Sequence, residues 1–263
     1  MSAVRRHPII TFFVLTYALT WGFLPLGIFG TTGPLIAALI VISITQGLSG
    51  LRDLGSRMIR WRVGWIWWAL AIGLPLAVHL LTVGLNVGLG APAPSLSQFS
   101  PLSGLIVVFA VRLIDPLDGP MGEEPGWRGF ALPRLQADRS PLLASLILAV
   151  LVTLWHLPLA FVGGMKPLDF LGPIAFTFVA TWLFNHTGGS VLMTIVAHAT
   201  EGTIQTEAFW SAGAAAARMS LLYGVVWLAV AVGLVLFDRQ LWRGPAPAPA
   251  RVQPAYGGES RVR

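Results

Sequence analysis

The sequence predicts an all-α membrane protein, a polytopic bundle of about eight transmembrane helices. Its 263 residues are 55% hydrophobic and only 11% charged, whereas soluble domains carry roughly 25% charged residues. Mean hydropathy is +0.74, and the apolar residues gather in segments close to the roughly 20 residues that a spanning helix needs. A soluble core cannot hide this much apolar surface, so a lipid bilayer is the natural solvent.

Eight segments approach spanning length, namely 9–29, 33–50, 64–89, 101–120, 140–162, 168–186, 190–207 and 217–237. The first follows Arg5 and Arg6 as a signal peptide would, but it is long and no small-residue cleavage site follows, so we expect it to stay as a helix. The third is flanked by tryptophans, which favour the membrane interface. Asp115 and Pro116 interrupt the end of the fourth, which is the weakest of the eight. The others rest on apolar length.

The arginines predict that both termini are cytoplasmic. Arginine-rich stretches occur at the N-terminus, in the second and fourth connections and after the last helix, whereas the alternate connections carry only Lys166 and Arg218. Cytoplasmic loops are enriched in Lys and Arg, and this alternation fits eight helices but not seven. We therefore expect a multi-pass plasma-membrane protein, and its Arg-, Ala- and Pro-rich usage with a single lysine indicates a bacterial source.

The chain is expected to form one transmembrane domain, 1–243, followed by a disordered cytoplasmic tail, 244–263, which is rich in Pro, Ala and Gly. The net charge of +6 is distributed in short arginine runs between apolar segments. That distribution predicts membrane lipid rather than nucleic acid as the partner. The absence of cysteine excludes disulfides and thiol chemistry.

The stretch MGEEPGWRGF (121–130) places two glutamates and an arginine beside apolar segments. If it is helical, Glu124 and Arg128 lie four residues apart on one face and pair with each other. Glu123 then points about 100° away, towards Trp127. A carboxylate in that position is a candidate base with a raised pKa. The alternative is a solvated ion cluster in a cytoplasmic loop.

Histidines occur well inside three of the predicted spans, as His156 in LVTLWHLPLAF, His198 in TIVAHATEGT, and His79. Each alone is most simply a hydrogen-bonded core residue, and His79, which has no motif around it, is interpreted as structural. Ionisable groups inside spanning helices cost about 2.5–3.5 kcal/mol each. Placing two histidines and a glutamate pair in or beside the spans is therefore energetically costly, and these residues form the candidate site.

These residues resemble three motifs of the CPBP family, also called the Abi or CAAX protease family. EEPGWRGF matches E-E-x-x-x-R, VTLWHLP resembles F-x-x-x-H, and HATEG resembles H-x-x-x-N. The order, the spacing and the eight-helix count agree over roughly residues 100–205. The resemblance implies an intramembrane endopeptidase, often labelled a metalloprotease, that hydrolyses a peptide bond of a membrane-associated or lipidated peptide or protein.

The resemblance also implies roles for the site residues. Glu123 and His156 would be catalytic and activate a water, His198 would help to stabilise the oxyanion, and Glu124 and Arg128 would support the site. A glutamate and two histidines also suit a zinc ion with an open position for water. Both cofactor assignments, none or zinc, stay open, and the lack of an H-E-x-x-H sequence slightly favours the metal-free one.

Two positions depart from the motifs. Val152 replaces a phenylalanine, which changes packing, and Gly202 replaces the asparagine. Losing one oxyanion donor typically costs about 2.7–4 kcal/mol in barrier. Thr200 or Thr203 would be substitute donors, and Gly202→Asn is expected to leave activity unchanged or raise it.

The missing asparagine favours an alternative function, a non-catalytic membrane scaffold or bacteriocin-immunity factor on the same fold. A transporter is a third class, since transporters also bury charges near the midplane. A transporter of that kind would show paired halves with matching broken helices, which the sequence lacks.

Overall fold

The computed structural model describes residues 3–244 except 96, 98–101, 163, 205–208 and 211. In that range the chain consists of helices joined by turns, which confirms the predicted all-α class. The elements are α1 Ala3–Arg6, α2 Pro8–Trp21, η1 Leu24–Leu26, α3 Gly33–Thr45, α4 Gly47–Met58, α5 Trp65–Gly88, α6 Leu102–Ile114, α7 Gly119–Gly126, η3 Trp127–Ala131, α8 Leu132–Leu135, α9 Pro141–His156, α10 Pro158–Phe161, η4 Pro167–Phe170, α11 Leu171–His186, α12 Val191–Thr203, α13 Gly213–Phe237 and α14 Arg239–Arg243. The predicted tail beyond Gly244 lies outside the described residues.

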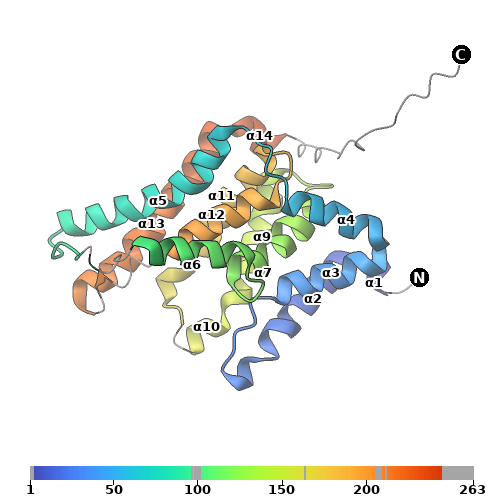
Figure 1. The fold of residues 1–263 in the computed structure, drawn as a ribbon, viewed down its shortest axis with the longest axis horizontal. Helices are drawn as coiled ribbons and strands as arrows, with labels where there is room; N and C mark the ends of the chain where they lie inside the picture. The colour runs from blue at the N-terminus through green and yellow to red at the C-terminus, as the bar shows by residue number, and fades with distance from the viewer. Residues whose placement is uncertain are drawn as a thin grey trace, which may run out of the picture.

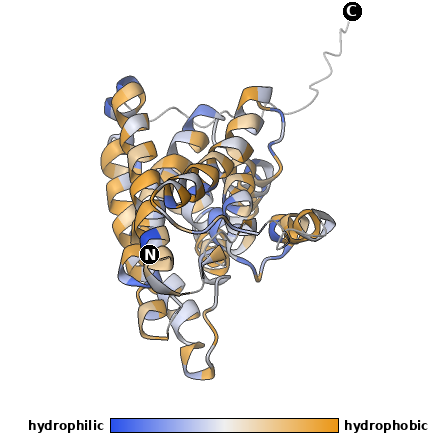
Figure 2. Cartoon of the chain, turned by 90° about the vertical axis from the view of Figure 1, so that its left-hand side faces the viewer, coloured by the Kyte–Doolittle hydropathy of each residue, from blue (hydrophilic) through white to orange (hydrophobic). Residues whose placement is uncertain are grey.

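Among the described residues, five helical stretches are long and apolar enough to span a membrane: Pro8–Leu26, Trp65–Gly88, Pro141–Phe161, Pro167–His186 and Gly213–Phe237. Figure 2 shows that hydrophobic colouring predominates over the helices of the bundle. The other three expected spans correspond to α3, α6 and α12, which have 13 residues each. At about 1.5 Å per residue such a helix is shorter than the roughly 30 Å hydrocarbon core. The polytopic bundle is confirmed, and the count of eight stays a prediction.

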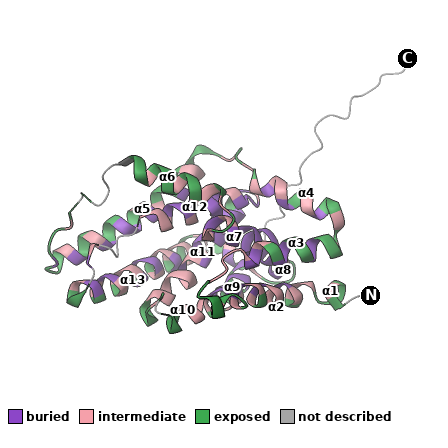
Figure 3. Cartoon of the chain, turned by 60° about the horizontal axis from the view of Figure 1, so that its bottom comes forward, coloured by how far each residue is buried: buried purple, intermediate pink, exposed green. Residues whose placement is uncertain are grey.

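Two packed clusters form the interior. The first is built by α2, α3 and the chain from α7 to α9, around Phe12, Trp127 and Trp155. The second is built by α5, α11, α12 and α13, around Val179 and Trp227. Helices α7 and α12 pack on each other and join the two clusters. They lie at the centre of the bundle (Figure 1), where Figure 3 shows a concentration of buried residues.

Helix α7 carries the two motif glutamates, and its small residues bring it against α3. The Asp118 carboxylate caps its N-terminus by accepting from the Gly119 N–H at 2.7 Å. A Cβ added at Gly126 would lie 2.5 Å from the Cβ of Pro34. One added at Gly122 would lie 2.8 Å from the carbonyl oxygens of Thr31 and Pro116. Small residues four apart allow this close helix approach inside membranes. Gly122 and Gly126 therefore allow α7, which carries the two glutamates, to pack closely against its neighbours.

The chain continues as a helix beyond Pro125, although proline lacks the N–H that an α-helix requires. Helix α7 runs directly into the π-helical turn η3, which continues into α8. Such π turns accommodate irregular hydrogen bonding and are frequent at functional sites. The turn places Trp127 and Phe130 in the core, where both are fully buried.

The predicted orientation is tested with reporter fusions. Fusions after Arg60, between α4 and α5, and after Gly244 are both expected to read cytoplasmic, because the arginine-rich connections share one side. A fusion at Lys166 should read external and serves as the control. An external signal from either of the first two fusions would rule out the eight-helix orientation.

Candidate active site

The charged side chains of the glutamate motif are buried. Glu123, Glu124 and Arg128 are 6%, 0% and 2% exposed, so the solvated loop cluster considered from the sequence is wrong. Arg128 Nη1 donates to Glu124 Oε1 at 2.9 Å, which confirms the pair that the four-residue spacing predicts. Glu123 points elsewhere and accepts from Trp127 Nε1 at 3.2 Å through Oε2. Its second oxygen, Oε1, is thereby left for other partners.

His198 comes from α12, whose N-terminus is capped by Ser190. Its Nδ1 lies 3.0 Å from Glu124 Oε1. A carboxylate oxygen can only accept, so Nδ1 carries a proton and Glu124 receives hydrogen bonds from both Arg128 and His198. Glu124 therefore joins α12 to α7 and fixes the orientation of the imidazole.

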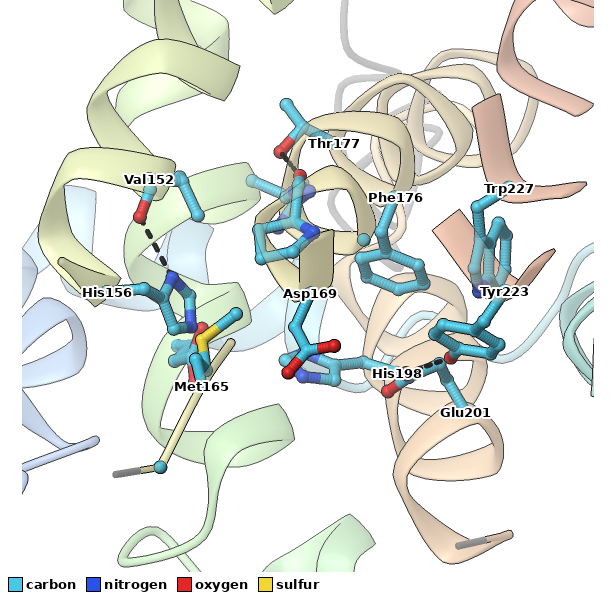
Figure 4. Close-up of a pocket in the computed structure, with 15 residues that line it drawn as sticks. Val152, His156, Met165, Asp169, Phe176, Thr177, His198, Glu201, Tyr223 and Trp227 are labelled. Carbon is cyan, nitrogen blue, oxygen red and sulfur yellow. Dashed lines mark hydrogen bonds between the residues drawn. The ribbon is translucent and has the colours of Figure 1, made fainter. Parts of the chain in front are cut away.

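His156 is the last residue of α9. Its Nδ1 lies 2.9 Å from the Val152 carbonyl oxygen, one turn earlier in the same helix. Because a carbonyl oxygen accepts, the proton is on Nδ1 and the Nε2 lone pair is available as an acceptor. Figure 4 shows the ring turned so that this second nitrogen faces Met165, into the cavity.

The structure brings the three predicted site residues to one cavity. Its volume is about 340 Å³, and Glu123, His156 and His198 all line it. The rest of the wall is largely apolar and includes Val152, Met165, Pro173, Phe176 and Trp227. A partly apolar cavity with a few convergent polar groups is the usual form of a small binding site.

The cavity lining also includes polar groups to which the motifs assign no role, among them Asp169, Glu201 and Tyr223. The Tyr223 hydroxyl donates to the Glu201 carboxylate, and Asp169 accepts from the Lys166 N–H at 2.7 Å. Figure 4 shows these groups on the His198 side of the cavity. Glu201 was detectable, because it follows His198 by three residues on one helix. Asp169 lies in a short 3₁₀ turn without a motif, and no sequence signal marks it.

His79 is buried away from the cavity lining. Its Nε2 lies 3.0 Å from the Glu201 carbonyl oxygen. This contact agrees with the structural role expected for it.

The pKa values of the two glutamates are shifted in opposite directions. Helix α7 lies outside the five candidate spans, and burial there raises the pKa of Glu123 to about 7, with Glu124 adding to the rise and His198 and Arg128 opposing it. Burial alone would also raise the pKa of Glu124, but Arg128 and His198 hold it below its ordinary value. Glu123 can therefore gain and lose a proton near neutral pH, whereas Glu124 stays ionised.

The space beside Gly202 is occupied. A Cβ added there would lie 2.3 Å from Nη1 of Arg112 in α6, so the expectation that Gly202→Asn is neutral or favourable lacks its structural basis. The proposed substitutes do not face the cavity either. Thr200 donates to the Val196 carbonyl at 2.8 Å, and Thr203 donates likewise within α12.

The placement of the side chains decides whether zinc fits. In the part of the chain that the structure describes, no three His, Cys, Asp or Glu side chains gather closely enough to hold a metal ion. Glu123, His156 and His198 therefore do not form the zinc set that the sequence left open.

Comparison with known proteins agrees with the motif assignment. Residues 101–204 match the family described as type II CAAX prenyl endopeptidase, Rce1-like. The chain is also 29% identical over 136 residues to CAAX prenyl protease 2 of Methanococcus maripaludis. That alignment covers 46% of this chain and 49% of the relative, so the chain spans about half the length of the protein that it matches.

Proposed function

The chain belongs to the CAAX protease family, and we propose that it is an intramembrane endopeptidase acting on a membrane-associated or lipidated peptide or protein. The observation that carries this proposal is the convergence of Glu123, His156 and His198, from three separate helices, on one cavity. In this proposal Glu123 and His156 provide hydrogen-bond acceptors to the cavity, and His198 provides a donor.

The proposed reaction begins with a water between the two acceptors. Glu123 Oε1 or His156 Nε2 takes a proton from the water as its oxygen attacks the scissile carbonyl carbon. The carbonyl oxygen becomes an oxyanion and accepts from His198 Nε2, which donates only when the ring carries both protons. The Glu124 carboxylate at Nδ1 stabilises that form. Collapse of the intermediate breaks the C–N bond, and the proton passes to the leaving amine.

The apolar wall supports the proposed substrate class. Met165, Phe176 and Trp227 suit aliphatic side chains next to the scissile bond. The relative's name refers to prenyl substrates, which carry a lipid on the cysteine of a C-terminal C-a-a-X sequence. We propose the same class here.

The test is cleavage of a quenched fluorescent C-a-a-X peptide by the full chain in lipid vesicles. The prenylated peptide is expected to be cut by wild type and not by Glu123→Gln. The same peptide without the prenyl group is the matched control and should be cut more slowly. Equal fluorescence from wild type and Glu123→Gln would instead favour the non-catalytic scaffold, which the missing asparagine at Gly202 supports.

Activity is expected to depend on pH through Glu123. Because its pKa is raised to about 7, the carboxyl is protonated and inactive as a base below that value. The rate should fall about tenfold per pH unit below it.

The free energy of unfolding should depend on pH in the opposite direction. A group with a raised pKa in the folded state contributes stability that is fully present below about pH 4.5 and lost as pH rises through about 7. Cleavage rate and thermal unfolding across pH 5–9 measure both, and a flat rate profile would contradict the role of Glu123.

A further inference from the structure

An arginine from outside the three motifs lies next to the site. Arg112, in the last turn of α6, places its Nη1 2.3 Å from the ideal Cβ position of Gly202 and its Cζ 2.9 Å from it. The guanidinium therefore fills the volume that a side chain at position 202 would take. Only a glycine permits this approach, because any Cβ would overlap the guanidinium.

The position is close to the reacting groups. Gly202 follows His198 by one helical turn on the same face of α12, a spacing of about 5–6 Å between Cβ positions. On the other side, Arg112 Nη1 lies 3.4 Å from Asp118 Oδ1, the cap of α7. The next residue, Gly119, lies between the catalytic groups. Its ideal Cβ position is 3.0 Å from Glu123 Oε1 and 3.6 Å from His198 Nε2.

Arg112 also has more N–H donors than its ion pair with Asp118 uses. A guanidinium has five N–H donors and cannot lose its charge in a protein. Within the described ranges its polar partner is Asp118, at ion-pair distance. Its side chain is 21% exposed, so the guanidinium is not sealed inside the bundle.

We propose that Arg112 supplies from α6 the hydrogen-bond donor that α12 lacks at Gly202, directed at the oxygen of the scissile carbonyl. The inference rests on the proposed endopeptidase function and assigns one more catalytic residue to it. As water oxygen bonds to the carbonyl carbon, the C=O π pair moves to oxygen, and that oxyanion accepts from an Arg112 N–H. No proton is transferred from the guanidinium, and collapse restores the carbonyl as the C–N bond breaks.

The test is a double-mutant cycle on prenylated-peptide cleavage in vesicles. Arg112→Ala is expected to lower kcat by about 10²–10³-fold, the usual effect of removing one oxyanion donor, with little change in KM. Gly202→Asn alone should also lower kcat, because its side chain displaces the guanidinium. The double variant Arg112→Ala/Gly202→Asn should recover activity relative to Arg112→Ala, since the amide enters the vacated space and donates. Arg139→Ala removes an exposed arginine paired with Asp138 and should match wild type.

Two outcomes would overturn the proposal. One is wild-type kcat in Arg112→Ala while Glu123→Gln is inactive, which would leave the proposed function standing. The other is a double variant no faster than Arg112→Ala, which would reduce Arg112 to an ion-pair partner of Asp118. If Arg112→Ala does not fold, Gly202→Ala applies the same test, because its methyl group displaces the guanidinium without removing it. Unchanged kcat there would also contradict the donor role. No difference between wild type and Glu123→Gln would instead remove the proposed function itself.

Discussion

Replacing Glu123 with glutamine is expected to abolish peptide cleavage while the protein still inserts and folds. Glutamine keeps the shape of the side chain and can still accept from Trp127 Nε1, but it cannot take a proton from water. Loss of a general base typically costs about 10²–10⁴-fold in rate. Burial raises the pKa of Glu123, so the ionised form is unfavourable in the folded protein and the neutral amide removes that cost. Thermal unfolding of Glu123→Gln at pH 8 should therefore be unchanged or higher.

The measurement combines cleavage of the prenylated peptide with thermal unfolding in detergent for each variant. His156→Gln serves as a second test, since it removes the other acceptor that faces the cavity. It should lower the rate and spare the Glu124–Arg128 pair. A Glu123→Gln protein that cleaves as fast as wild type would refute the role of Glu123 as the base.

Replacing Glu124 with glutamine is expected to damage the fold first. The carboxylate is fully buried and accepts from Arg128 Nη1 at 2.9 Å and His198 Nδ1 at 3.0 Å. A neutral amide leaves the Arg128 guanidinium as a buried cation without its counter-ion. Removing one partner of a buried pair costs roughly 3–5 kcal/mol of stability. Cleavage should fall as well, because His198 loses the carboxylate that orients it.

The control is Asp138→Asn, which removes a carboxylate paired with Arg139 at an exposed position. Exposed ion pairs contribute about 0–1 kcal/mol, so its unfolding temperature in detergent should stay near that of wild type. The predicted order of stability is Glu123→Gln at or above wild type, then Asp138→Asn, then Glu124→Gln. If Glu124→Gln unfolds at the same temperature as Asp138→Asn, the Glu124–Arg128 pair does not stabilise the bundle as its burial indicates.

The sequence by itself determined the class of the protein and the identity of its main polar residues. Apolar length and the scarcity of charge predict membrane helices, because a bilayer accepts only chains whose backbone groups bond internally. The spacing of Glu124 and Arg128 predicted their pairing, since helical periodicity places residues four apart on one face. The pairing of Glu123 with Trp127 follows from the same period.

Only the tertiary structure decided what these residues meet across helices. The burial of Glu123 and its neighbours depends on the contact between α7 and α3 at Gly126, which no local pattern reports. The structure also gives α3, α6 and α12 only 13 residues each, fewer than their apolar segments led us to expect. The consequence of Gly202 depended on Arg112, 90 positions earlier in the sequence. A missing side chain is visible in a sequence, but the group that fills its space is set by contacts between helices that are distant along the chain.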